Sequence, residues 1–149
     1  MFLIEALKGS KYKVIIVDST FEKLSIQNCE IRKDINYGKE LNEIIAKAFC
    51  VVVPLKDVNI SSGQTVIIQA MMFGKPIIIT KNNAIKEYVD DGITGFIINK
   101  NKDELIKKIE LLSEDLELYK SMSLHARQKF INEFTIEAMG RNVGNIIMS

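Results

Sequence analysis

The sequence predicts an α/β fold in which helices cover both faces of a parallel sheet. Three short runs, residues 13–17, 50–54 and 76–80, are rich in β-branched residues and almost entirely apolar, which is typical of strands buried on both faces. Between them, residues 37–48 and 65–73 carry apolar side chains at helical spacing. Because strands alternate with helices, we expect right-handed crossovers and a Rossmann-like arrangement.

Two weaker strands complete the expected sheet. Residues 29–32 follow the first strand after a polar stretch, and residues 95–98 come after the turn sequence Asp91-Gly92. Glycine favours such a turn because it adopts positive φ without steric cost. Both segments are therefore expected to add strands to the sheet.

The chain is expected to be helical after residue 100. Asn101 is a candidate N-cap with Glu104 as its return partner, and apolar residues follow at helical spacing. A second helix is expected over residues 113–130, and Thr135 is expected to cap a last helix over residues 136–147. These helices are too polar to form a core of their own, so we expect them to pack on the sheet or on a neighbour outside the chain.

Length and composition fit one globular domain. The chain has 149 residues, 47% of them hydrophobic, and we treat residues 1–149 as a single domain whose helical part is 101–149. With 20 Lys and Arg against 19 Asp and Glu, the formal net charge is +1. So small a net charge excludes binding to nucleic acid or to an anionic membrane that is driven by overall charge.

The amino terminus and the cysteines predict a cytoplasmic protein. The opening residues, MFLIEALKGSK, lack the basic region, long apolar region and cleavage site of a signal peptide. No apolar run approaches the ~20 residues of a membrane-spanning helix. Cys29 and Cys50 each lie in an apolar stretch, and we expect both to be reduced core residues rather than a disulfide.

The polar loop between residues 54 and 65 is the candidate site. Open parallel sheets bind ligands beyond the carboxyl ends of their strands, where a helix N-terminus offers unpaired amides and a partial positive charge. The hydroxyl groups of Ser61, Ser62 and Thr65 can donate to an anion such as phosphate, and Gly63 lets the backbone approach it closely. The structural alternative is that Ser62 only caps the helix and Gly63 only turns the chain.

Three stretches of the sequence resemble a known enzyme family. They are VVVP at residues 51–54, SSGQTVIIQAMMFGKPII at residues 61–78, and EYVDDGITGFII at residues 87–98. Together they resemble the donor-binding half of GT-B glycosyltransferases of group 1 (family 4), which carry a Pro-Ser stretch, a Glu-Gly-Phe-Gly loop, a Leu-Glu-Ala-Met helix and Gly-Lys-Pro-Val-Ile. The pattern extends over residues 2–147, and residues 51–98 are its specific part.

The resemblance implies a site for the diphosphate and the ribose of a nucleotide sugar. In the family, one glutamate touches the donor sugar and a second bonds the ribose, and their positions fall on Ser61 and Gln69 here. The Gln69 amide can still bond a ribose hydroxyl, whereas Ser61 cannot stabilise an oxocarbenium-like centre as a carboxylate does. Nucleotide binding therefore survives these substitutions better than catalysis. Donor contacts are expected from Ser61, Ser62, Gly63, Gln64, Thr65, Gln69 and Arg32, and Ser61 also holds the family's catalytic position.

The family's donor domain begins with a strand that this sequence lacks. Its members open with a strand ending in Gly-Arg and a Lys-Gly loop, ahead of a helix whose counterpart is residues 3–6. That first strand is central in the order 3-2-1-4-5-6, so the strands at 13–17 and 50–53 must pair directly or leave open edges. The acceptor-binding half is missing as well, so we expect a truncated or split enzyme that needs a second polypeptide, or a gene remnant.

Two functions follow from the residues and the resemblance. The first is the nucleotide-sugar-binding half of a glycosyltransferase that transfers a hexosyl group to a saccharide or lipid-linked acceptor, as in polysaccharide biosynthesis, and that is inactive without an acceptor half or a homo-oligomer partner. The alternative is a degenerate, non-catalytic module that acts in protein-protein assembly. No cofactor, metal ion or nucleic acid is expected, and membrane association is expected only through a partner. His125 is expected to be a solvated or packing residue.

Overall fold

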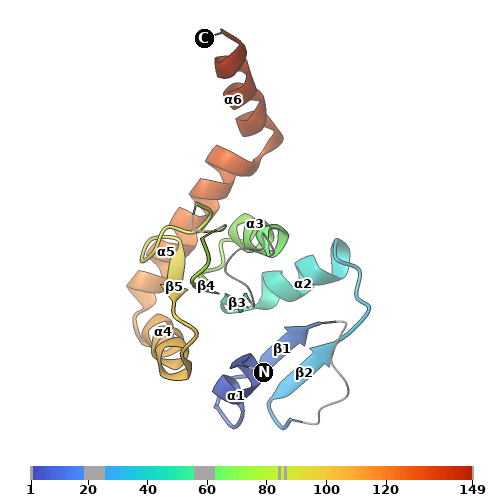
Figure 1. Ribbon diagram of the computed structural model, residues 1–149, viewed down its shortest axis with the longest axis vertical. Coiled ribbons are helices and arrows are strands. Elements are labelled where there is room, and N and C mark those ends of the chain that lie inside the picture. The colour runs from blue at the N-terminus through green and yellow to red at the C-terminus, as the bar shows by residue number, and fades with distance from the viewer. Residues whose placement is uncertain (1, 19–25, 56–62, 84, 86, 149) are drawn as a thin grey trace.

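The computed structural model describes residues 2–18, 26–55, 63–83, 85 and 87–148, and Figure 1 shows their path. In chain order the elements are α1 (Phe2–Leu7), β1 (Val14–Val17), β2 (Cys29–Arg32), α2 (Lys39–Lys47), β3 (Val51–Val53), α3 (Gln64–Met72), β4 (Ile77–Thr80), β5 (Gly95–Ile98), α4 (Lys102–Glu114), α5 (Leu116–Lys129), the π-helix η1 (Phe130–Phe134) and α6 (Ile136–Met148). Helices lie between β2 and β3 and between β3 and β4, whereas β2 follows β1 and β5 follows β4 without a described helix between them, and only helices follow β5.

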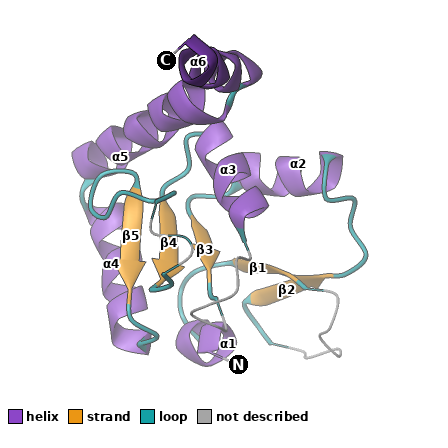
Figure 2. Cartoon of the chain, turned by 45° about the horizontal axis from the view of Figure 1, so that its top comes forward, coloured by secondary structure: helices purple, strands orange, loops and turns teal. Residues whose placement is uncertain are grey.

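The described strands form two parallel sheets rather than one continuous sheet. β1 pairs with β2, while β3, β4 and β5 form a second sheet in that order, and Figure 2 shows the two groups apart. Among the described residues no strand lies between β1 and β3, so the facing edges of the two sheets stay unpaired. Of the two expected outcomes for this gap, open edges are the one observed.

Helices cover both faces of the three-stranded sheet. On one face Val53, Ile77 and Ile79 pack with buried residues of α2, α3 and α5. On the other face Ile78 and Phe96 pack with buried residues of α1, α4 and α5. Side chains alternate between the faces because successive residues of a strand point in opposite directions. The predicted α/β class, its parallel strands and its helices on both faces are confirmed.

The C-terminal helices follow the expected caps with two corrections. Asn101 Oδ1 accepts a hydrogen bond from the Glu104 amide at 3.0 Å, as predicted, but the Glu104 carboxylate bonds the Asn99 amide instead of returning to Asn101. The second helix starts at Leu116, not at residue 113. Asp115 is extended and its side chain accepts from the Leu118 amide at 2.9 Å, which ends α4 and caps α5.

The last helix is the least covered element. Thr135 Oγ1 accepts from the Ala138 amide at 3.2 Å, so the predicted cap of α6 is confirmed. α6 projects from the rest of the molecule and packs mainly on η1 (Figure 1). Ile136, Met139 and Val143 are 86%, 54% and 55% exposed. α4 and α5 therefore pack on the sheet as expected, whereas this side of α6 lacks a neighbour among the described residues.

Candidate functional site

The candidate site lies where β3 ends and α3 begins. The Leu55 amide, just beyond β3, donates to Thr80 Oγ1 at 2.8 Å, and the Thr80 hydroxyl is 3.4 Å from the Leu55 carbonyl oxygen. Thr80 is the last residue of β4 and is buried. This pair of contacts ties the carboxyl ends of two neighbouring strands together, which fixes the point from which the chain leaves toward α3.

Packing alone explains why a glycine stands at position 63, directly before α3. Its φ is +85°, a left-handed conformation that side chains disfavour. A Cβ atom at this position would also lie 2.9 Å from Val53 Cγ1 and 3.3 Å from Leu55 Cδ2. Gly63 is thus required by its contact with the end of β3, whether or not an anion binds there.

The first turn of α3 carries no cap from a described side chain. Gly63 accepts the first helical hydrogen bond, from the Ile67 amide at 3.0 Å, but offers no side-chain acceptor to the turn. Within the described residues, the amides of Thr65 and Val66 have no acceptor, and Thr65 is exposed. No acidic residue lies in this turn. The helix dipole places a partial positive charge beside these two amides.

Ser61 and Ser62 lie outside the described residues, so their expected contacts stay predictions. Gln64 and Thr65 are described as the first two residues of α3. The structure thus brings Gly63, Gln64 and Thr65 together at the helix start.

Gln69 lies further along α3 and binds α2. Its Nε2 donates to the Tyr37 carbonyl oxygen at 3.1 Å and to Asn42 Oδ1 at 3.0 Å. Its Oε1 is buried and has no donor among the described residues. Sequence reasoning missed Tyr37 and Asn42, because helical spacing identifies apolar faces and gives no signal for a polar contact between helices.

Arg32 ends β2, on the two-stranded sheet. Its guanidinium bonds Glu30 Oε1 at 2.6 Å and is half exposed. No hydrogen bond or ion pair between described residues joins it to α3. The donor contact expected of Arg32 therefore stays a prediction.

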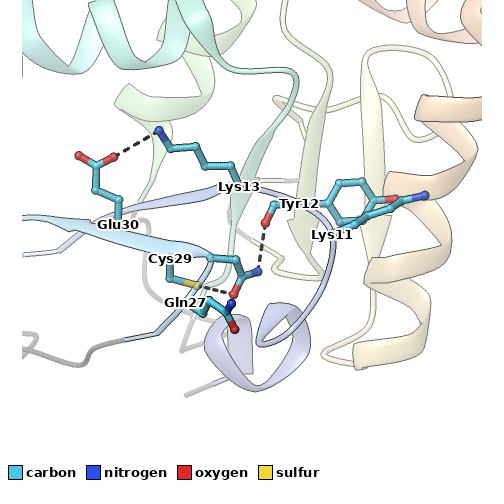
Figure 3. A pocket seen from close by; sticks show the side chains of 7 residues that line it. Lys11, Tyr12, Lys13, Gln27, Cys29 and Glu30 are labelled. Carbon is cyan, nitrogen blue, oxygen red and sulfur yellow. Dashed lines mark hydrogen bonds and ion pairs between the residues drawn. The ribbon is translucent and has the colours of Figure 1, made fainter.

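The hollow in Figure 3 lies at the opposite ends of the strands, where β1 and β2 begin. Its volume is about 330 Å³. The Asn28 side chain in its wall donates to the carbonyl oxygens of Leu7 at 2.8 Å and Tyr12 at 3.0 Å, which ties α1 to the start of β1. Lys13 pairs with Glu30 at 3.7 Å. Asn28 and Lys13 are thus held by neighbouring residues, whereas the Tyr12 hydroxyl is buried and has no hydrogen-bond partner among the described residues. The full lining is Lys11, Tyr12, Lys13, Gln27, Asn28, Cys29 and Glu30.

Other reactive side chains of the described part do not form a site. No group of three or more His, Cys, Asp or Glu residues is placed there to hold a metal ion. His125 is exposed and lies 3.4 Å from Ser121 Oγ. Cys29 and Cys50 are free thiols, and burial raises the pKa of Cys50 to about 12. None of the described helices has the length and apolar character to cross a membrane.

Solved structures share this fold. The HepE protein of Anabaena, in complex with UDP-glucose, matches with a TM-score of 0.76 and 18% identity, over 99% of this chain and 44% of its own. Sucrose-phosphate synthase from Thermosynechococcus elongatus gives 0.78 and 16%, over 99% and 41%. A glycosyltransferase from Rickettsia africae gives 0.74 and 20%, over 97% and 42%. The chain thus spans less than half the length of each.

Sequence comparison identifies the family. No curated protein is similar enough in sequence to count as a relative. A family model described as glycosyl transferases group 1 matches residues 2–129, which run from the first residue of α1 to the last residue of α5. The match includes both sheets and α3, and the GT-B fold that the resemblance implied is confirmed. The chain therefore belongs to the glycosyl transferases group 1 family.

Proposed function

We propose that this chain is the donor-binding half of a glycosyltransferase and holds a nucleotide diphosphate sugar. The observation that carries the proposal is the start of α3, beyond the carboxyl end of β3, which no described side chain caps. In the proposal the diphosphate accepts hydrogen bonds from the amides of Thr65 and Val66, beside the positive end of the helix dipole. The solved HepE complexes with UDP and with UDP-glucose support this class of ligand.

The same site assists departure of the nucleotide during hexosyl transfer. The bond between the anomeric carbon and a diphosphate oxygen breaks, and the acceptor hydroxyl oxygen bonds the anomeric carbon while its proton passes to a base. The α3 amides stabilise the negative charge that builds on the leaving diphosphate. Ser61 and Gln69 occupy the positions of the family's two glutamates, so this half lacks the carboxylates that balance positive charge on the sugar. Donor binding is therefore retained better than catalysis.

An acceptor-binding half is the partner that completes this site in the proposal. The similar solved proteins are more than twice as long as this chain. Among the described strands the facing edges of β1 and β3 are unpaired, and α6 exposes Ile136, Met139 and Val143. An apolar helix face of this kind is stabilised by burial against a partner. The acceptor, a saccharide or a lipid-linked saccharide, would bind to that half.

The open edges and the exposed face of α6 also favour the alternative function, a non-catalytic assembly module. Donor binding separates the two functions. We also propose a cytoplasmic location, because the two cysteines are free thiols. We propose no cofactor, and the nucleotide sugar is the donor substrate.

The variant Thr65→Glu tests the donor site. A carboxylate in the first turn stabilises α3 through the helix dipole but repels a diphosphate. Titration calorimetry with UDP is expected to show at least about tenfold weaker binding, with an unchanged or higher melting temperature. The neutral control Thr65→Gln, of similar length, is expected to bind within about threefold of wild type. Gly63→Asp is a poorer test, because any Cβ at Gly63 crowds Val53.

Failure of the wild-type chain to bind UDP, GDP or ADP at millimolar concentration contradicts the donor proposal. In that case the assembly module is favoured. Equal weakening by Thr65→Glu and Thr65→Gln contradicts the placement of the diphosphate at α3, because only the first variant adds charge.

A further inference from the structure

The polar contacts between α2 and α3 converge on the Gln69 amide. Nε2 makes two hydrogen bonds, to the Tyr37 carbonyl oxygen at 3.1 Å and to Asn42 Oδ1 at 3.0 Å. Oε1 is buried and no donor among the described residues reaches it. Both hydrogens of Nε2 are therefore bonded, whereas Oε1 is an acceptor without a donor among the described residues.

The backbone before α2 holds the Tyr37 carbonyl in place. Asn36 Oδ1 accepts from the amides of Gly38 at 2.9 Å and Lys39 at 3.0 Å. The Glu40 carboxylate in turn accepts from the Asn36 amide at 2.9 Å. With its neighbours fixed in this way, the peptide that carries the Tyr37 carbonyl has little freedom to turn.

This carbonyl decides which end of the Gln69 amide faces α2. A carbonyl oxygen only accepts, so it attracts Nε2 and repels Oε1. Asn42 must then present its own oxygen, Oδ1, to the second Nε2 hydrogen. The Tyr37 carbonyl thus fixes the orientation of the Gln69 amide, which in turn fixes the orientation of the Asn42 amide.

These contacts also favour an amide over a carboxylate at position 69. A glutamate here would put a carboxylate oxygen opposite the Tyr37 carbonyl oxygen and Asn42 Oδ1, which are both acceptors. Repulsion among three acceptors in a partly buried place is unfavourable. The start of α2 in this chain is therefore matched to glutamine.

We propose that Asn42 is a positioning residue for donor binding: with the Tyr37 carbonyl it holds Nε2 of Gln69, so that Oε1 accepts a hydrogen bond from a ribose hydroxyl of the nucleotide sugar. This inference rests on the proposed function. A buried acceptor without a donor is uncommon in folded proteins, and a ligand hydroxyl supplies the missing donor. Because Oε1 is covered in the ligand-free chain, the hydroxyl reaches it only when the side chains over it move.

The test measures how strongly the chain distinguishes UDP from its 2′-deoxy and 3′-deoxy forms. Wild type is expected to bind UDP about tenfold more tightly than at least one deoxy form. Gln69→Leu, which removes the acceptor, is expected to abolish the preference. Asn42→Leu is expected to reduce it to about threefold or less, whereas Asn42→Asp keeps an acceptor for Nε2 and is expected to restore it. A purely structural role of Asn42 would weaken all three ligands equally.

A second measurement reads the contact itself. Hydrogen exchange of the Gln69 side-chain amide, followed by NMR, is expected to be slow in wild type and Asn42→Asp and fast in Asn42→Leu. The inference is overturned if Asn42→Leu keeps the full preference, whatever its exchange rate, or if wild type binds all three nucleotides equally. In both cases binding of UDP still supports the donor site. Absence of all nucleotide binding removes the proposed function and this inference together.

Discussion

The two sheets of the molecule are covered to very different extents. In the three-stranded sheet every side chain of β4 is buried, and the two cores meet across it. In the two-stranded sheet Ile16 is buried, but Ile15 beside it is 40% exposed, and no residue of β2 is fully buried. Burial of apolar surface is the main favourable term in folding, so the difference teaches that stability is concentrated around β4.

The same difference divides the candidate site. Gly63 and Thr65 stand at the start of α3, which packs directly on the three-stranded sheet. Arg32 belongs to the thinly covered sheet. The start of α3, which we assign to the diphosphate, therefore rests on the better-packed sheet, whereas Arg32 does not. Four predictions compare the two sheets, from the largest expected effect to the smallest.

The largest effect is expected from Gly95→Ala in β5. A Cβ atom there would lie 2.2 Å from the Ile77 carbonyl oxygen, inside the three-stranded sheet. The strands must separate to admit it, so the free energy of unfolding is expected to fall by about 3 kcal/mol or more. The matched control is Gly9→Ala, next to α1, where φ is +73° but nothing lies within 4 Å. Backbone strain alone predicts a loss of about 1 kcal/mol there. Urea unfolding measures both, and equal losses would contradict the comparison.

Truncation of one isoleucine in each sheet is the next test. Ile78→Ala removes a side chain with 0% exposure from β4 and is expected to cost about 3 to 4 kcal/mol, since it leaves a cavity. Ile15→Ala on β1 is expected to cost about 1 kcal/mol or less, because the side chain is already partly hydrated. Chemical denaturation of the two variants measures both losses in the free energy of unfolding. A larger loss of stability for Ile15→Ala would contradict the conclusion that the main core surrounds β4.

The two-stranded sheet is expected to depend on a polar junction more than on its core. Asn28→Leu removes the hydrogen bonds to Leu7 and Tyr12 and is expected to cost about 1 to 3 kcal/mol, because the carbonyl oxygens lose their donor. Hydrogen exchange is expected to accelerate in β1 and to stay unchanged in β4. The neighbouring exposed residue supplies the control, Gln27→Leu, which should change neither. Acceleration in both sheets together would show that they open as one unit.

The smallest effect is a pH dependence that distinguishes the two thiols. Burial raises the pKa of Cys50, beside β3, from 9.0 to about 12, and also raises the pKa of Cys29 on β2. The folded chain keeps the Cys50 proton at pH values where the unfolded chain has lost it. The free energy of unfolding is therefore unaffected by titration of this thiol below pH 9. It falls by about 1 kcal/mol per pH unit as the pH rises from 9 toward 12.

The measurement is the free energy of unfolding between pH 8 and about 11. Cys50→Ala is expected to remove part of the decline, and the control Cys29→Ala is expected to keep most of it. If the wild type and Cys50→Ala decline in parallel, the buried thiol is not the cause.

Most elements could be predicted because their signals are local. The apolar runs became β1, β3 and β4, and the capping roles of Asn101 and Thr135 are confirmed. The start of α5 was predicted three residues too early, because the sequence alone does not show that Asp115 adopts the extended backbone that separates α4 from α5. For the candidate site, the position of α3 after β3 was predicted, but the partners of Gln69 were not.

The sequence by itself determined the class of the fold and the order of its elements. β-branched runs and helical spacing act within a few residues, so no distant contact is needed to interpret them. Only the tertiary structure decided that the described sheets stay apart, that Val53 leaves no room for a side chain at position 63, and that Gln69 turns its nitrogen toward α2. The Gln69 contact joins residues 32 positions apart. Such contacts depend on how whole elements pack, which no local pattern encodes.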